Sequence, residues 1–110
     1  MIEISYSVTA KKDLEKFGDY IAEQLRNPQT ALNTVNKIQA TISKLTKFPL
    51  IGTPLSSIYE VDTDYRFLVC GKYLAFYRSQ ESEVFIDRIL YGRQSYLAIL
   101  FGYLPQDETG

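Results

Sequence analysis

The fold of this chain is decided by residues 65–78, which read Tyr-Arg-Phe-Leu-Val-Cys-Gly-Lys-Tyr-Leu-Ala-Phe-Tyr-Arg. Two runs rich in aromatic and branched side chains meet at Gly71-Lys72, and a two-residue connection with a glycine is a strong hairpin signal. If these two residues form the loop, Cys70 faces Tyr73 on the neighbouring strand. A third β-rich run, residues 84–91, follows and ends at a glycine. The sequence therefore predicts an antiparallel sheet here.

Alternation of side chains along the hairpin divides its residues between the two faces of the sheet. One face is almost wholly apolar, and we expect it to lie against helices; its members are Tyr65, Phe67, Val69, Leu74, Phe76 and Arg78. The other face is mixed, and we expect it to carry the functional side chains; its members are Arg66, Leu68, Cys70, Tyr73, Ala75 and Tyr77.

The first half of the chain predicts one strand and two helices. Residues 2–8 alternate apolar and polar side chains, as a half-buried strand does. Thr9 can cap a helix with apolar positions at Leu14, Phe17, Ile21 and Leu25. Asn27-Pro28 suits the start of a second helix, with Asn27 as its cap. That helix has apolar positions at Ala31, Val35, Ile38, Ile42 and Leu45 and ends near Phe48-Pro49.

The rest of the chain completes an α+β plan. We expect a loop at residues 49–64, a short helix at 93–101 and a frayed tail at 102–110. The order is β-α-α-β-β-β with an antiparallel helical hairpin packed on a small, mostly antiparallel sheet. A length of 110 residues allows a single domain, residues 1–110.

Composition excludes several classes of protein. The net charge of −1 gives no basic footprint with which to hold nucleic acid by charge alone. The chain has no histidine, which excludes Ser-His-Asp and Cys-His catalysis and the usual zinc sites. Its one cysteine, Cys70, lies in an apolar strand, which predicts buried packing and fits a reducing cytosol. No transmembrane run or signal peptide is recognisable, so a soluble, cytoplasmic protein without metal or organic cofactor is expected.

Several short motifs occur together in a recognisable order. They are Asp13-Leu14, Pro49 and Gly52, Tyr65-Arg66, Tyr73, Tyr77-Arg78, Arg88 and Gly92-Arg93. With the element order, they make the chain resemble the RelE/ParE superfamily of bacterial toxins over nearly its whole length. The resemblance implies a cognate antitoxin protein, held in a hetero-oligomer, that wraps the toxin and keeps it inactive. The surplus of tyrosine agrees with such an interface.

Branches of the superfamily differ in their target. Those similar to RelE cut messenger RNA on the ribosome, which requires groups that bind the phosphate and move protons. The resemblance implies Arg66, Arg93, Tyr96 and Arg78 as the catalytic candidates. Leu68 and Leu74 stand where further cations would be expected.

Those similar to ParE inhibit DNA gyrase, and the hairpin and the strand-to-helix junction fit this branch better. The target-binding candidates are Arg93, Gln94, Tyr96, Tyr73 and Tyr77. Gln94-Ser95 stand where Arg-Asp is frequent. A third hypothesis is a non-toxic binding module of the same fold. Any of the arginines can instead form a salt bridge to Glu60, Asp62, Asp64 or Asp87. For Arg88 we favour that role, and for Arg66 and Arg93 both roles stay open.

Overall fold

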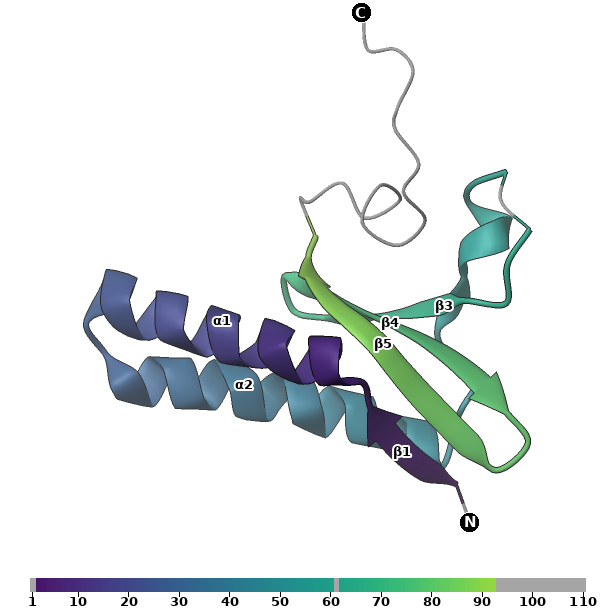
Figure 1. The fold of residues 1–110 in the computed structure, drawn as a ribbon, viewed down its shortest axis with the longest axis horizontal. Coiled ribbons are helices and arrows are strands. Elements are labelled where there is room, and N and C mark those ends of the chain that lie inside the picture. Colours follow the sequence, from purple (N-terminus) through teal and green to yellow (C-terminus); the bar gives the residue numbers. More distant parts are fainter. Residues whose placement is uncertain (1, 61, 93–110) are drawn as a thin grey trace, which may run out of the picture.

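The computed structural model describes residues 2–60 and 62–92, which form a helical hairpin packed on one sheet (Figure 1). The hairpin consists of α1 (Val8–Leu25) and α2 (Pro28–Ile42), followed by a 3-10 turn, η1 (Ser43–Thr46). Its two helices run side by side (Figure 1). The expected order of elements is thereby confirmed up to residue 92, while the expected helix at 93–101 and tail at 102–110 lie outside the described residues.

The sheet has five strands in the order β1-β5-β4-β3-β2. They are β1 (Glu3–Tyr6), β2 (Thr53–Pro54), β3 (Arg66–Cys70), β4 (Tyr73–Gln80) and β5 (Glu83–Tyr91). Strand β1 pairs in parallel with β5, and the other pairs are antiparallel. The predicted α+β class with a mostly antiparallel sheet is confirmed. The expected loop at 49–64 contributes the short edge strand β2 and a 3-10 turn, η2 (Leu55–Ser57).

The hairpin register agrees with the prediction. Cys70 pairs with Tyr73, and Arg66 pairs with Tyr77, across a turn at Gly71-Lys72. Gly71 has φ +65°, a conformation that costs glycine little and a residue with a Cβ considerably more. The turn chemistry therefore fixes the register of β3 and β4 locally.

The expected orientation of the hairpin is wrong, because the mixed face packs against the helices. Cys70, Ala75 and Tyr77 belong to one buried cluster with Leu14 and Ile38 of the helical hairpin. The opposite, apolar face is covered by the segment before β3: Phe76 and Leu90 pack on Leu55, with Tyr59, Tyr65, Phe67 and Leu74 around them. Each face contributes to a buried cluster, although Val69 on the apolar face is 59% exposed, so hydrophobicity alone could not choose between the two faces. The mixed face suits the helices because its tyrosine hydroxyl finds polar partners inside the fold, as described below.

The helix starts are set by side-chain caps. Ser7, not the predicted Thr9, caps α1: its Oγ accepts from the Ala10 N–H at 2.9 Å and donates to the Asp87 carbonyl at 2.8 Å. Ser7 thus ties the first turn of α1 to β5. Asn27 caps α2 as predicted, accepting from the N–H groups of Gln29 and Thr30.

Candidate functional site

Two side chains of the hairpin hold the segment before β2 in place. The Tyr77 hydroxyl donates to the Pro49 carbonyl and accepts from the Gly52 N–H, both at 2.9 Å. The Arg66 Nη1 donates to the Gly52 carbonyl at 2.9 Å and to the Leu50 carbonyl at 3.3 Å. A Cβ on Gly52 would lie 2.5 Å from the Tyr77 hydroxyl oxygen, so this approach requires glycine. We call this arrangement of Arg66 and Tyr77 on residues 49–52 the clamp.

The clamp gives a structural role to two of the candidate site residues. Tyr77 has no exposed surface, so in this conformation it offers nothing to a gyrase or other target. Burial raises its pKa, which keeps the hydroxyl protonated and able to donate. The Arg66 guanidinium faces main-chain carbonyls instead of the acidic side chains considered as its alternative partners.

A second network joins α1 to the part of β5 that β1 does not pair with. Asp13 is 6% exposed, and its carboxylate accepts from Arg88 at both Nε and Nη2, at 2.9 and 3.0 Å. The same carboxylate accepts from the Ile89 N–H at 2.9 Å, beyond the point where β1 stops pairing with β5. The bidentate pair raises the pKa of Arg88 above its usual value. The salt bridge favoured for Arg88 is therefore present, but its partner is Asp13 and none of the four expected acidic side chains.

Arg78 takes part in a third cluster, on the face away from the helices. Its Nε lies 3.3 Å from Asp87 Oδ2, and its guanidinium carbon lies 5.5 Å from the centre of the Tyr65 ring. The Tyr65 hydroxyl donates to the same Asp87 carboxylate. Burial, together with this hydrogen bond, raises the pKa of Tyr65 to about 12. A tyrosine so protonated is a poor proton acceptor near neutral pH.

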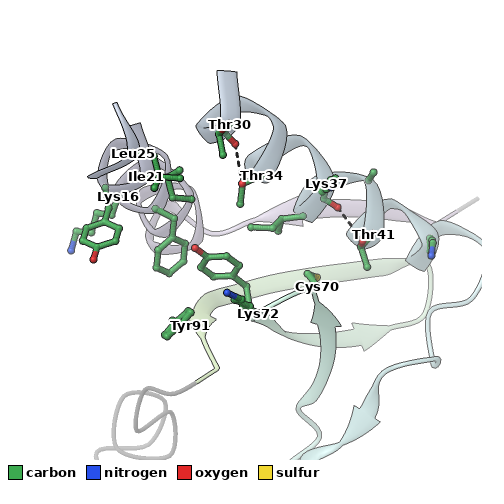
Figure 2. Close-up of a pocket in the computed structure, with 17 residues that line it drawn as sticks. Lys16, Ile21, Leu25, Thr30, Thr34, Lys37, Thr41, Cys70, Lys72 and Tyr91 are labelled. Atoms are coloured by element: carbon green, nitrogen blue, oxygen red, sulfur yellow. Dashed lines mark hydrogen bonds between the residues drawn. The ribbon is translucent and has the colours of Figure 1, made fainter. Parts of the chain in front are cut away.

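A groove of about 1140 Å³ lies between the helical hairpin and the β3–β4 turn (Figure 2). Its apolar lining comes from both helices and from the hairpin: Phe17, Ile21, Leu25, Ile38, Cys70 and Tyr73. Four lysines stand among the lining residues, and none of those residues carries a carboxylate; the lysines are Lys16, Lys37, Lys44 and Lys72. The hydroxyls of Thr34 and Thr41 are bonded to main-chain carbonyls of their own helix (Figure 2). The groove is thus apolar inside and positively charged around it.

The sequence prediction missed this groove, although one signal points to it. Residues 24–59 contain Arg26, Lys37, Lys44 and Lys47 and no Asp or Glu. A chain with net charge −1 therefore carries one strongly cationic stretch, which a count over each half of the sequence conceals. Two of these lysines, Lys37 and Lys44, border the groove.

Of the target-binding candidates, Tyr73 is the one that lies in the groove. Its ring is 4.6 Å from that of Phe17 and 5.7 Å from that of Tyr91, centre to centre. Burial raises its pKa, with smaller contributions from Tyr91 and Tyr20. The remaining candidates, Arg93, Gln94 and Tyr96, lie outside the described residues.

The chain leaves the sheet at the edge of this groove. The Gly92 N–H donates to the Lys72 carbonyl at 2.9 Å, which fixes the end of β5 beside the hairpin turn. Within residues 2–60 and 62–92, no group of acidic, cysteine or histidine side chains is arranged to hold a metal ion. Helices long and apolar enough to cross a membrane are also absent from that part of the chain.

Solved structures of toxin–antitoxin systems contain chains with the same fold. The chain is similar to a chain of the chromosomal ParDE toxin–antitoxin system from P. aeruginosa, at 25% sequence identity and a TM-score of 0.69, over 83% of this chain and 96% of that one. YafQ from E. coli shares the fold at 18% identity and a TM-score of 0.50, over 88% of this chain and 98% of that one. YafQ in the E. coli DinJ–YafQ complex matches similarly, at 19% identity over 93% and 100% of the two chains, with a TM-score of 0.50. Comparison with curated proteins gives no match.

The family itself follows from a match over most of the sequence. Residues 4–96 match the model of the ParE toxin of type II toxin–antitoxin systems, parDE. The chain belongs to this ParE toxin family, within the RelE/ParE superfamily that the hairpin motifs indicated.

Proposed function

We propose that this chain is a toxin that binds and inhibits DNA gyrase, and that it blocks growth until a cognate antitoxin neutralises it. The observation that carries the proposal is the engagement of Arg66 and Tyr77 in the clamp. With these side chains committed to the fold, the hairpin lacks the phosphate-binding cation that the ribonuclease branch places there. Membership of the ParE family supports the same choice.

Tyr65, Tyr73 and Tyr77 are also poorly suited to act as bases in proton transfer. RNA cleavage needs a base that activates the ribose hydroxyl and a cation that stabilises the phosphate. The pKa of Tyr65 is about 12, and burial raises the pKa values of Tyr73 and Tyr77 as well. Arg78 is paired with Asp87. The ribonuclease alternative therefore depends on Arg93 and Tyr96.

The groove is the proposed docking site of the antitoxin. Its apolar lining and its four lysines suit an amphipathic segment with an apolar face bordered by acidic side chains. Its volume is large enough for several side chains of such a segment. The ParDE and DinJ–YafQ structures that resemble this chain are toxin–antitoxin assemblies, which supports a hetero-oligomer here. A cytoplasmic location is proposed with it, since gyrase and the buried, unpaired Cys70 both fit a reducing compartment.

The test is a pulse-label time course after induction in a bacterial host, following DNA and protein synthesis separately. We expect DNA synthesis to stop first, and the purified chain to inhibit supercoiling by gyrase in the absence of RNA. Co-expression of the neighbouring reading frame should restore growth. Arrest of protein synthesis first, with messenger RNA cleavage lost in Arg93→Gln and kept in the exposed control Arg26→Gln, would instead establish the ribonuclease.

A further inference from the structure

An exposed apolar turn lies immediately after η1. Within four residues, Phe48 is 58% exposed, Leu50 61% and Ile51 47%. Single exposed apolar side chains are common on soluble proteins and need no explanation. Three on one turn make a local patch of the kind that marks a protein contact. We call Phe48, Leu50 and Ile51 the apolar turn.

The main chain of this turn is held from several directions. The Phe48 N–H donates to the Lys44 carbonyl at 3.0 Å, and the Ile51 N–H donates to the Phe48 carbonyl at 3.2 Å. The clamp described above fixes the Pro49, Leu50 and Gly52 main chain through Tyr77 and Arg66. A free loop with this composition would be expected to fold its apolar side chains inward. Here a buried tyrosine and an arginine hold the backbone while the side chains stay in solvent, so part of the ordering cost of binding is already met.

The charges around the turn select the chemistry of a partner. Lys44 and Lys47 are both exposed and directly precede the turn, and no acidic residue occurs in the sequence between Glu23 and Glu60. Leucine and isoleucine side chains offer no hydrogen bonds to a phosphate backbone. The matching surface is therefore that of a protein, with an apolar pocket bordered by carboxylates.

The apolar turn is separate from the groove. None of residues 47–52 lines the groove. Lys44, which lies before this stretch, lines the groove, and its carbonyl also accepts the hydrogen bond from the Phe48 N–H of the turn. A ligand in the groove would leave Phe48, Leu50 and Ile51 exposed. The simplest arrangement is therefore that the groove and the apolar turn bind different partners. The part of that ligand that contacts Lys44 would also lie next to the turn.

We propose that the apolar turn is the surface by which this toxin docks on its target, and that the target presents an acidic-rimmed apolar pocket. This inference rests on the proposed function, since it assumes a growth-blocking target distinct from the antitoxin. The clamp of Arg66 and Tyr77 acts as its positioning device. Antitoxin in the groove blocks the target by occupying the space around Lys44.

The experiment compares two triple variants for growth arrest, counted as colonies after induction. The turn variant carries Phe48→Ser, Leu50→Ser and Ile51→Ser. The control variant replaces three equally exposed side chains elsewhere: Val8→Ser, Leu32→Ser and Ile58→Ser. We expect the turn variant to restore colonies by about 100-fold, the loss expected when apolar hot-spot residues are removed. The control should arrest growth like the wild type.

Three further measurements keep the test decisive. Thermal unfolding checks that the turn variant folds. If that variant does not fold, the test uses Lys47→Glu, which leaves the apolar side chains intact and must restore colonies about tenfold. Co-purification with the product of the neighbouring reading frame should be equal for the wild type and the turn variant. Gel filtration of the wild type should give a monomer.

The proposal is overturned if the folded turn variant arrests growth as the wild type does. Loss of the antitoxin complex in that variant would assign the turn to the antitoxin, and a dimer that the variant abolishes would assign it to a second copy. A wild-type chain that leaves growth unchanged overturns the proposed function together with this inference.

Discussion

Replacement of Asp13 by alanine should be among the most damaging single changes in this chain. The carboxylate is 6% exposed and accepts three hydrogen bonds, two from Arg88 and one from the Ile89 N–H. It holds α1 against β5 just where β1 no longer covers the strand edge. Its removal therefore leaves a guanidinium and a main-chain donor without their acceptor.

The magnitude follows from what each group loses. Breaking a buried ion pair costs about 3–5 kcal/mol, and an unsatisfied buried N–H costs about 1–3 kcal/mol. The Arg88 side chain is 26% exposed, so its guanidinium recovers part of its hydration. We therefore expect Asp13→Ala to lower the free energy of unfolding by about 3 kcal/mol, the low end of these ranges. For a domain of this size the midpoint temperature should fall on the order of 15 °C.

Urea unfolding at neutral pH, followed by circular dichroism, measures this change. Asp19→Ala, an exposed position on the same helix, is the matched control and should stay within about 0.5 kcal/mol of the wild type. A double-mutant cycle with Arg88→Met should give a coupling of about 2 kcal/mol. A loss below about 1 kcal/mol with no coupling would refute the reasoning, because the carboxylate would then not be holding the helix to the strand.

Three other predictions follow from the same contacts. Tyr77→Phe removes both hydrogen bonds of the Tyr77 hydroxyl and should lower the free energy of unfolding in urea by about 2 kcal/mol. The same change at the exposed Tyr20 should be neutral, and equal effects at the two positions would contradict the clamp. Gly18→Ala should raise the free energy of unfolding by about 0.5–1 kcal/mol, since its new Cβ would lie an ordinary 3.5 Å from the Val35 side chain. Gly52→Ala should lower the free energy of unfolding, since its Cβ would lie 2.5 Å from the Tyr77 hydroxyl oxygen. Thermal scans that show the same sign for both variants would count against this packing. Burial raises the pKa of the Cys70 thiol from 9.0 to about 11, so labelling of the folded chain by a thiol reagent at pH 8 should be roughly 100-fold slower than labelling in urea. The free energy of unfolding should keep its full value below pH 9 and fall as the pH rises toward 11, because the thiol of the unfolded chain ionises first. Fast labelling of the folded chain would disprove the burial.

The hairpin and its register could be predicted because their causes are local. Gly71-Lys72 specifies a two-residue turn, and the pairs on either side follow from it by counting. The cap at Asn27 and the proline after it are equally local signals. The cap at Ser7 was missed because Thr9 carries a similar side chain. Its choice depends on the Asp87 carbonyl, which only the folded sheet brings near.

The orientation of the hairpin could not be predicted, because it depends on what covers each face. Periodicity showed one apolar and one mixed face, and burial of the apolar face against helices was the simpler hypothesis. The segment before β3 supplies a second cover through Leu55, so each face of the hairpin contributes to a buried cluster. The mixed face then reaches the helices with Tyr77 satisfied by Pro49 and Gly52, partners far away in sequence.

The motifs that reveal the family serve the fold, which is why they predict the architecture better than the target. Pro49 and Gly52 meet Arg66 and Tyr77 in the clamp. In the same way, Asp13 of the helical hairpin meets Arg88 of the sheet.

Side chains committed in this way hold two elements of the framework together, so they are not free to distinguish one target from another. Discrimination between targets must then come from the surfaces that these motifs leave open. In the described chain, those surfaces are the lysine-bordered groove and the apolar turn. Substitution of the exposed side chains of these surfaces should therefore alter partner choice while stability stays near that of the wild type, whereas substitution of the motif residues of the clamp and of the Asp13–Arg88 pair should lower stability first.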